Sequence, residues 1–204
     1  MNINQTFENF MMGKSNEEAF KLCKEYQLLE KPLLLIGEPG VGKSHLLHAI
    51  ANHCNLKVLY LTCYEFCDLY IDAIYYHRLN QFKSSFLNYD VILIDDLQDC
   101  FGKESTTQQL STMVQEWSKD CIGVILASSI EEMKDYFDFC KVAHIDCFDE
   151  DLSKQLLKKE LKRYDQEIVE RYILNMDRNF RNMYEIYEAM NEAAIEAFIN
   201  ELKF

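Results

Sequence analysis

Short apolar runs alternate with amphipathic segments along the first 150 residues. The runs are typical of strands buried on both faces and cover residues 33–36 (LLLI), 57–62, 90–94 (DVILI), 122–127 and 142–145. The periodicity of the other segments predicts helices over residues 16–29, 44–54, 65–73, 79–86 and 107–118. Strands that alternate with helices indicate an α/β fold with a parallel sheet and helices on both of its faces.

The pattern changes from about Asp151 onward. Residues 151–164, 166–176 and 181–202 predict three helices with no strand among them. We therefore expect two domains, an α/β domain over residues 1–150 and a small helical domain over residues 151–204. No apolar run approaches the ~18 residues of a membrane span. The N-terminus MNINQTFENF lacks a signal-peptide pattern, so we expect a cytoplasmic protein with no membrane contact.

The stretch GEPGVGKS (Gly37–Ser44) lies between the first strand and the next helix. It matches G-x-x-x-x-G-K-[ST], the P-loop, whose glycines let backbone N–H groups point at phosphate oxygens. The helix that follows adds its positive end to the same site. We expect Lys43 to reach the β and γ phosphates and Ser44 to ligate Mg²⁺. A chance glycine-rich turn is the alternative, which the flanking strand and helix disfavour.

Two acidic residues follow the strand DVILI. Ligands of parallel sheets bind at the carboxyl ends of the strands. In P-loop NTPases an acidic residue at this point holds Mg²⁺, and we assign this role to Asp95. Asp96 could orient an attacking water. A capping carboxylate at the junction of strand and loop is the alternative for either residue.

The charge and the cysteines restrict the possible partners and ligands. The net charge is −13 and the chain has only five arginines, whereas duplex DNA binders usually carry a basic stripe. We therefore expect no duplex DNA recognition. None of the eight cysteines forms a C-x-x-C pair, which argues against zinc. We expect reduced, unpaired thiols that pack as small hydrophobic residues.

Several segments together resemble the AAA+ domain of the bacterial replication initiator DnaA. They are TFENFMMGKSN (Thr6–Asn16), GKSHLLHAIAN (Gly42–Asn52), KVLY (Lys57–Tyr60), VILIDDLQ (Val91–Gln98) and GKEST (Gly102–Thr106). The resemblance runs from about Thr6 to the C-terminus. It implies a P-loop AAA+ fold that binds ATP or ADP with Mg²⁺, with a parallel five-stranded sheet flanked by helices and a C-terminal three-helix lid.

The resemblance also implies roles for single residues. The segment FMMGKSN matches the one that wraps adenine, with Met11 and Met12 as apolar contacts; a hydrophobic staple to the next helix is the alternative. Arg181 in NFRNMYEIYEAM matches the lid arginine that contacts the phosphates and couples nucleotide state to domain angle. The implied nucleotide-binding residues are Phe10, Met11, Met12, Gly13, Asn16, Gly37, Pro39, Gly40, Val41, Gly42, Lys43, Ser44, His45 and Arg181.

The fourth strand ends in ILASS, and in AAA+ ATPases this strand carries a polar residue near the γ-phosphate. Ser128 or Ser129 is placed for that role, and we assign it to Ser129 together with Asp96 as the catalytic pair. A strand-terminating turn is the alternative for each serine. His45 and His48 lie at i and i+3 on the P-loop helix, where packing is preferred over a metal site.

Three comparisons with the family pattern bear on function. No arginine lies between Arg78 and Arg163, so residues 131–145 lack the family's arginine finger, which is worth orders of magnitude in rate. We therefore expect at most a slow ATPase, as a monomer or as the end-capping subunit of an assembly. The sequence ends at Phe204, directly after the lid, and we expect this chain to lack the family's C-terminal DNA-binding domain. The insertion over residues 64–86 is retained, and its tyrosines suggest either packing or weak single-strand contact.

The leading hypothesis is a nucleotide-switched regulator of bacterial replication initiation that acts through protein–protein contacts. Its partner would be the initiator DnaA or the replicative helicase. The alternatives are an adaptor that resembles a helicase loader, a free-standing NTPase, and a nucleotide-bound scaffold that does not switch.

Overall fold

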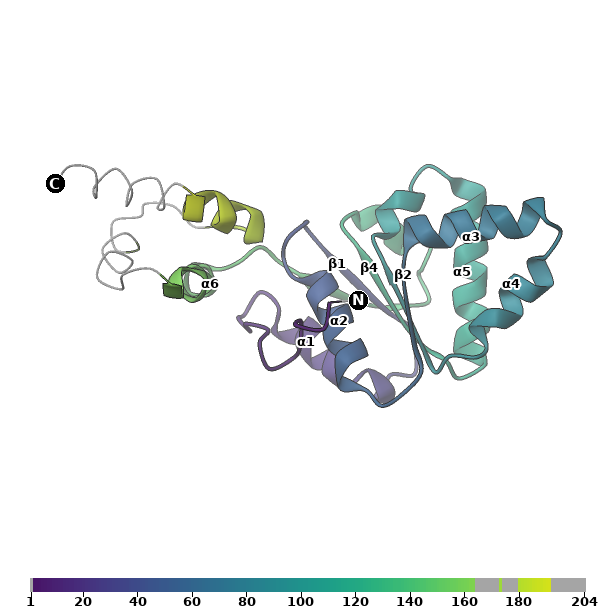
Figure 1. The fold of residues 1–204 in the computed structure, drawn as a ribbon, viewed down its shortest axis with the longest axis horizontal. Helices are drawn as coiled ribbons and strands as arrows, with labels where there is room; N and C mark the ends of the chain where they lie inside the picture. The colour runs from purple at the N-terminus through teal and green to yellow at the C-terminus, as the bar shows by residue number, and fades with distance from the viewer. Residues whose placement is uncertain (1, 164–172, 174–179, 192–204) are drawn as a thin grey trace. The chain divides into compact units, whose positions relative to one another are not determined.

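The computed structural model of the chain describes residues 2–163, 173 and 180–191 (Figure 1). Contacts divide the chain into two compact units. The first unit comprises Met1–Phe10, Glu18–Gly37 and Gly42–Ile145. The second unit comprises Met11–Glu17, Glu38–Val41 and Asp146–Phe204. The P-loop sequence therefore contributes its tip to the second unit and its two ends to the first.

Five parallel strands form the sheet of the first unit, in the order β2-β3-β4-β1-β5. Their bounds are β1 Leu33–Gly37, β2 Val58–Thr62, β3 Val91–Asp95, β4 Gly123–Ser128 and β5 Lys141–Ile145. β3 and β4 lie in the interior of the sheet and are buried along almost their whole length. The predicted α/β fold with a five-stranded parallel sheet is confirmed.

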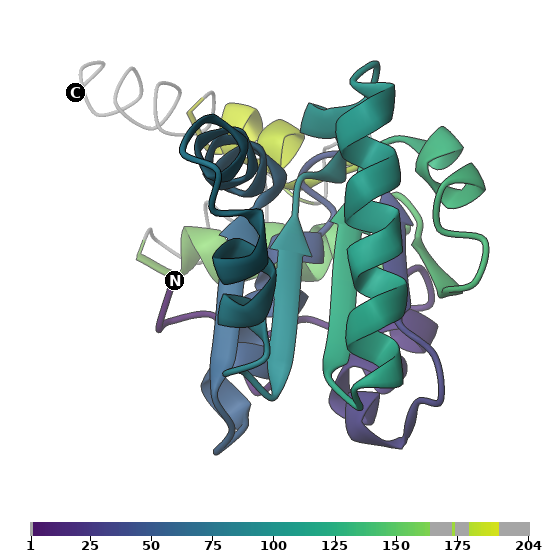
Figure 2. The ribbon, with the colours of Figure 1, turned by 90° about the vertical axis from the view of Figure 1, so that its right-hand side faces the viewer.

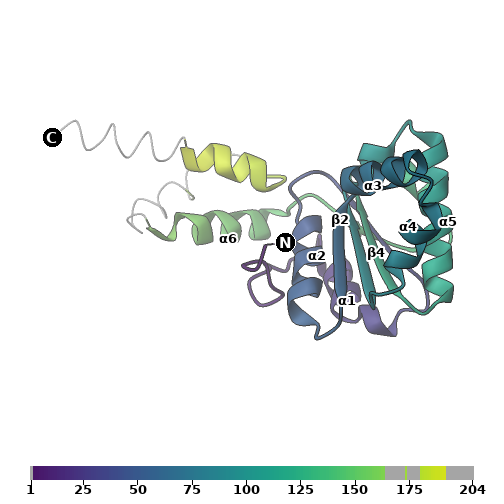
Figure 3. The same cartoon turned by 45° about the vertical axis from the view of Figure 1, so that its right-hand side comes forward.

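Helices cover both faces of this sheet. α1 and α2 lie on one side and α3, α4 and α5 on the other (Figures 1 and 3), and Figure 2 looks onto the second side with α5 in front of the strands. The bounds are α1 Glu17–Lys24, α2 Lys43–His53, α3 Cys63–Tyr75, α4 Leu79–Phe86 and α5 Glu104–Lys119. Alternate strand residues such as Ile92 and Ile94 pack with Phe66, Phe86 and Trp117 of these helices.

Helix bounds differ from the predicted ones where capping decides them. α3 begins at Cys63, two residues before the predicted start, because Thr62 and Glu65 form a capping box. The Thr62 hydroxyl accepts from the Glu65 N–H at 3.2 Å, and the Glu65 carboxylate accepts from the Thr62 N–H at 2.7 Å. The predicted helix over residues 16–29 is shorter, since a 3₁₀ turn, η1 (Tyr26–Leu28), follows α1. Two further 3₁₀ turns, η2 (Leu97–Cys100) and η3 (Glu131–Asp135), had no sequence prediction.

The second unit contains α6 (Glu150–Glu160), which the Asp149 carboxylate caps by accepting from the Leu152 N–H at 2.8 Å. η4 (Leu161–Arg163) follows, and residues 183–191 are helical. The helix predicted over residues 166–176 lies outside the described residues apart from residue 173. The helix predicted over residues 181–202 is described only as far as residue 191. Among the helices that the structure describes, none has the length and apolar character needed to cross a membrane.

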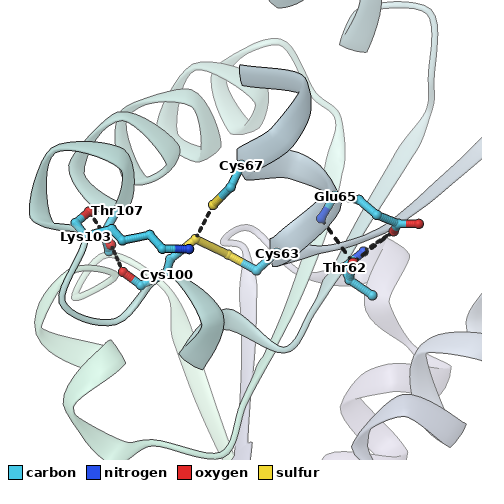
Figure 4. The surroundings of a disulfide bond; sticks show 7 residues. All are labelled: Thr62, Cys63, Glu65, Cys67, Cys100, Lys103 and Thr107. Atoms are coloured by element: carbon cyan, nitrogen blue, oxygen red, sulfur yellow. Dashed lines mark hydrogen bonds between the residues drawn. A yellow bond between two sulfur atoms is a disulfide. The ribbon is translucent and has the colours of Figure 1, made fainter. Parts of the chain in front are cut away.

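One prediction about the cysteines is wrong. Cys63 and Cys100 form a disulfide bond rather than two unpaired thiols (Figure 4). The fold brings them together because α3 begins directly after β2, and η2 ends shortly after the neighbouring strand β3. The free cysteines of the described part of the chain are Cys23, Cys54, Cys67, Cys121, Cys140 and Cys147.

Candidate nucleotide-binding site

The start of α2 has the backbone form that a P-loop requires. Gly42 caps this helix with a φ of 111°, in the left-handed region that favours glycine. A β-carbon at Gly42 would also lie 3.0 Å from Cε2 of the Phe10 ring. Backbone N–H groups in the first turn of an α-helix point along its axis toward the N-terminal end, and such groups bind anions. Ser44 is half-buried in this first turn.

Lys43 is directed back toward the end of β1. Its side chain is only 6% exposed, and Nζ donates a 2.7 Å hydrogen bond to the Gly37 carbonyl oxygen. Burial lowers the pKa of Lys43, whereas the nearby carboxylates of Asp95 and Asp96 raise it. The ammonium group therefore lies in a partly desolvated setting, where its attraction to an anion is stronger than in water.

Asp95 ends β3 and is 1% exposed. Both of its carboxylate oxygens are hydrogen-bonded: Oδ2 accepts from the Tyr60 hydroxyl at 2.8 Å, and Oδ1 accepts from the Asp96 N–H at 3.0 Å. Tyr60 comes from the adjacent strand β2, and its ring stacks on His48 at 4.5 Å between centroids. Burial, followed by the charge of Asp95, raises the pKa of the Tyr60 hydroxyl, so it stays a proton donor. These two hydrogen bonds therefore fix the orientation of the Asp95 carboxylate.

Asp96 has a strained backbone, with a φ of 56° and a ψ of 48°. Non-glycine residues with such angles are uncommon and are concentrated at functional sites. Its Oδ1 accepts from the Gln98 side-chain N–H at 2.8 Å, and the side-chain oxygen of Gln98, Oε1, accepts from the Ser129 N–H at 3.0 Å. Burial, followed by the charge of Asp95, raises the pKa of Asp96. Gln98, which sequence reasoning missed, therefore links both residues predicted to be catalytic.

The two serines that end β4 differ in their surroundings. The Ser128 hydroxyl is fully buried, donates to the Ile130 carbonyl and accepts from the Ile130 N–H, both at 3.0 Å. Ser128 thus closes the turn after the strand. Ser129 is half-buried, and its backbone is held by Gln98. Of the two serines, Ser129 is the one whose side chain is not fully enclosed by the protein.

The N-terminal segment is anchored on α2 through His45 and Phe10. His45 Nε2 lies 3.0 Å from both the Thr6 carbonyl oxygen and Asn9 Oδ1. The Phe10 ring meets His45 edge-on at 5.1 Å and stacks on Phe20 at 5.6 Å. These contacts account for the aromatic and histidine positions through packing within the first unit.

In the second unit, Asn16 organises the loop that was predicted to wrap adenine. It is 2% exposed, accepts from the Gly13 N–H at 2.9 Å and donates to the Met11 carbonyl at 3.1 Å. Gly13 approaches α6 so closely that a β-carbon would lie 3.0 Å from Leu152 Cδ2. Met12 and Gly13 line an open hollow of about 370 Å³ together with residues of α6. Asn16 therefore acts on the shape of this loop.

Also in the second unit, the tip of the P-loop is bonded to the segment that contains Arg181. Arg181 Nη2 donates to Glu38 Oε1 at 2.6 Å and lies 3.5 Å from Cys147 Sγ. The Gly40 carbonyl accepts from the Met183 N–H at 3.1 Å, and Gly40 has a φ of 82°. Arg181 is thus paired with an acidic residue that lies inside the P-loop sequence. Pro39 and the buried Val41 belong to the same tip.

Comparison with known protein families shows which family this chain is related to. Residues 1–137 match the model of the bacterial DnaA ATPase domain. The chain belongs to this family. DnaA of Helicobacter hepaticus is 40% identical over 112 residues, which cover 52% of the chain and 25% of that initiator. DnaA of Borreliella burgdorferi is 28% identical over 209 residues, which cover 97% of the chain and 43% of that initiator. The chain thus spans less than half the length of these DnaA relatives.

Solved structures agree on the fold. Domain III of DnaA from Thermotoga maritima matches with a TM-score of 0.78 at 25% identity. The match covers 98% of this chain and 92% of that domain. AMPPCP-bound DnaA from Aquifex aeolicus matches with a TM-score of 0.79 at 23% identity. The match covers 98% of this chain and 68% of the Aquifex aeolicus chain. The DnaC helicase loader is more distant, with a TM-score of 0.56 at 15% identity over 70% of the chain and 97% of its own.

Proposed function

We propose that this DnaA-family chain binds ATP or ADP with Mg²⁺ and regulates replication initiation in the cytoplasm through nucleotide-dependent contacts with a protein partner. The observation that carries the proposal is that one unit holds both a buried P-loop lysine, Lys43, and a buried carboxylate with two hydrogen bonds, Asp95, whose charge acts on that lysine. The AMPPCP bound by the Aquifex aeolicus DnaA, which shares the fold, supports it. In this proposal residues 1–150 form the nucleotide-binding domain and residues 151–204 form the lid.

The donor set of the first unit fits the proposed ligand. Mg²⁺ prefers oxygen ligands, and the Ser44 hydroxyl and the Asp95 carboxylate supply them. When bound, Mg²⁺ would neutralise phosphate charge. Lys43 would bind the β and γ phosphates by charge-assisted hydrogen bonds, in exchange for its bond to the Gly37 carbonyl. The base would be bound by the segment with Phe10, Met11, Met12 and Gly13, which Asn16 shapes.

Hydrolysis would depend on Asp96 and Ser129, both tied to Gln98. The raised pKa of Asp96 favours a carboxylate that can accept a proton from an attacking water. The segment from residue 131 to residue 145 contains no arginine. Its Lys134 is held by Glu131 at 2.9 Å, and a lysine lacks the fork geometry of an arginine finger. We therefore infer slow turnover at most.

The ion pair between Arg181 and Glu38 suggests how the nucleotide acts as a switch. Both side chains are exposed, and ion pairs of this kind stabilise a structure only slightly. The γ-phosphate of ATP carries more charge and offers more acceptors than one carboxylate, so it competes well for Arg181. ADP lacks that group and leaves Arg181 with Glu38. The state of Arg181 would thereby report which nucleotide is bound.

The partner is proposed to be the initiator DnaA or the replicative helicase, with this chain as a monomer or as the end subunit of an assembly. The likeness to the DnaC helicase loader is a likeness of fold, so binding has to decide between the two partners. A scaffold that does not switch would bind its partner equally well with either nucleotide, since such a ligand shifts no equilibrium.

The test is partner binding in defined nucleotide states. The chain is immobilised, and purified DnaA and replicative helicase of the same organism are titrated with AMPPCP or ADP present. We expect at least a fivefold difference in affinity between the two nucleotides for one partner, and Arg181→Ala should abolish this difference. Arg78→Ala, a change in an arginine that stacks on Tyr76 in the first unit, is the matched control and should preserve it. Equal affinities in the wild type would overturn the switch.

A further inference from the structure

Three buried sulfur atoms meet beside the carboxyl ends of β2 and β3. Cys63 and Cys67 lie one helical turn apart at the start of α3, and Cys100 ends η2 (Figure 4). Cys63 and Cys100 are bonded, with Cα atoms 6.4 Å apart, and the free Cys67 sulfur lies 3.1 Å from that of Cys100. All three sulfurs lie within 4.8 Å of one another.

We propose that Cys63, Cys67 and Cys100 form a redox-active thiol site in which Cys100 exchanges its disulfide partner between Cys63 and Cys67. In the exchange the Cys67 thiolate attacks the Cys100 sulfur. A Cys67–Cys100 bond forms, the Cys63–Cys100 bond breaks, and Cys63 leaves as a thiolate that takes up the proton released by Cys67. The number of disulfides does not change, so this step needs no oxidant.

Formation of the disulfide from three thiols does need one. The chemical class that fits is a small disulfide such as oxidised glutathione. Its two sulfurs are reduced to two thiols, while two cysteines of the site lose two electrons and two protons and form one bond. Reduced glutathione or dithiothreitol reverses the reaction with the same balance.

The positions of the three residues suit these roles. Cys63 is the first residue of α3, where the positive end of the helix stabilises the leaving thiolate. Cys100 is fixed from its other side, because the Thr107 hydroxyl donates to its carbonyl oxygen at 2.8 Å. Burial raises the pKa of the Cys67 thiol, and Lys103, which points toward the sulfurs in Figure 4, opposes that effect. The Cys100 sulfur is bonded to Cys63 and lies 3.1 Å from Cys67, so it is the one that both disulfides share.

A metal site fits the same sulfurs less well. Four thiolates around a tetrahedral zinc ion lie about 3.8 Å from one another, given Zn–S bonds of about 2.3 Å. The Cys67 and Cys100 sulfurs are already closer, at 3.1 Å, and Cys63 is bonded to Cys100. A disulfide with a third, free sulfur 3.1 Å from one of its atoms suits disulfide exchange rather than shared coordination of one ion.

The site has a defined place in the first unit. Cys63 follows Thr62, which pairs in register with Asp95. Cys100 ends the turn that Asp96 caps and that carries Gln98. A disulfide to Cys63 therefore ties η2 to the start of α3, whereas a disulfide to Cys67 would tie it one helical turn further along.

The test is thiol mapping of the full chain. The reduced chain is equilibrated with oxidised and reduced glutathione and quenched with an alkylating reagent. It is then digested with a protease that cleaves after glutamate, so that cleavage at Glu65 separates Cys63 from Cys67, and analysed by mass spectrometry. We expect two thiols lost per wild-type chain, and two cross-linked peptides, with Cys100 joined to Cys63 in one and to Cys67 in the other. Cys63→Ser should retain only the Cys67–Cys100 peptide, and Cys67→Ser only the Cys63–Cys100 peptide. Cys54→Ser, at a half-buried cysteine, is the matched control and should give both.

Several results would overturn the proposal. They are alkylation of all three of Cys63, Cys67 and Cys100 in the oxidised wild type, a disulfide confined to Cys63 and Cys100 at equilibrium, and mixed disulfides of these cysteines with glutathione alone. Stoichiometric zinc by elemental analysis, with all three sulfurs protected but not cross-linked, would assign a metal site instead. The wild-type map decides the matter even where a variant fails to fold.

Discussion

The Tyr60 hydroxyl donates a 2.8 Å hydrogen bond to Asp95 Oδ2 from the neighbouring strand. Thr62 pairs with Asp95 in the sheet, and Tyr60 lies two residues earlier on the same face of β2. One strand therefore positions the carboxylate that ends the next. This contact places Tyr60 among the residues that prepare the proposed Mg²⁺ site.

Replacing Tyr60 by phenylalanine should weaken both stability and metal-dependent binding. The variant leaves a buried carboxylate oxygen without its donor, which costs about 1–3 kcal/mol. We expect a loss of about that size in the free energy of unfolding measured with urea, together with weaker Mg²⁺-dependent ATP binding. Tyr64→Phe, at a residue that is 58% exposed, is the control. Equal stability of the two variants would remove Tyr60 from this role.

The difference in stability between Asp96→Asn and the wild type should depend on pH. The pKa of Asp96 is raised in the folded chain, first by burial and then by Asp95. The folded state therefore holds this proton more tightly than the unfolded state does, and ionisation as the pH rises costs stability. We expect Asp96→Asn to be more stable than the wild type at pH 7. The gain should shrink as the pH falls through the raised pKa toward the ordinary value of 3.8.

Thermal unfolding at several pH values measures this effect. Asp68→Asn, which removes one carboxylate at an exposed position of α3, is the control. A gain for Asp96→Asn that stays the same at low pH would mean that the charge of Asp96 is not its cause.

Substitutions at two glycines should distinguish the cost of backbone strain from the cost of steric overlap. Gly42 and Gly102 both have positive φ values, 111° and 79°, but only at Gly42 would an added β-carbon meet a neighbour within 4 Å, the Phe10 ring. Gly102→Ala should cost about 1–2 kcal/mol from the left-handed backbone alone. Gly42→Ala should cost more, because Phe10 must also move. Urea unfolding compares the two, and equal losses would contradict the role of Phe10.

Removing the charge of Glu38 should favour ATP over ADP. Glu38 holds Arg181 at 2.6 Å, and in the proposed switch the γ-phosphate must displace it. Glu38→Gln should tighten AMPPCP binding by roughly two- to fivefold, as expected for an exposed ion pair, and leave ADP binding nearly unchanged. Calorimetric titration measures both. A parallel change for both nucleotides would show that Glu38 acts on the P-loop rather than through Arg181.

The sequence predicted the sheet, the P-loop and the acidic end of β3 because each depends on a local pattern. A continuous apolar run indicates a buried strand, and glycine spacing indicates the loop. The order of strands and the pairing of β2 with β3 are not local. The role of Tyr60 follows only from that pairing. A tyrosine in one strand and an acidic residue at the end of another were the available signal for a hydrogen bond between them.

Gln98 and the sulfur cluster were missed for a related reason. Both depend on η2, a four-residue 3₁₀ turn that begins after a strained Asp96, and short turns of this kind have weak sequence signals. Cys63 and Cys100 are separated by 37 residues, so only the register of two strands brings them together. A search for C-x-x-C pairs finds only cysteines close together in sequence, so it could not find the contact between Cys63 and Cys100.

Binding of ATP and ADP is the most direct test of the proposed nucleotide site. Isothermal titration with Mg²⁺ would use nucleotide-stripped wild type, Lys43→Ala and, as a control, Lys119→Ala at the exposed end of α5. We predict micromolar or tighter binding by the wild type and Lys119→Ala, and a loss of about 10- to 150-fold in Lys43→Ala, because a hydrogen bond to a charged group contributes about 1.5–3 kcal/mol. No binding by the wild type, or equal binding by Lys43→Ala, would contradict the assignment of this P-loop as a nucleotide site.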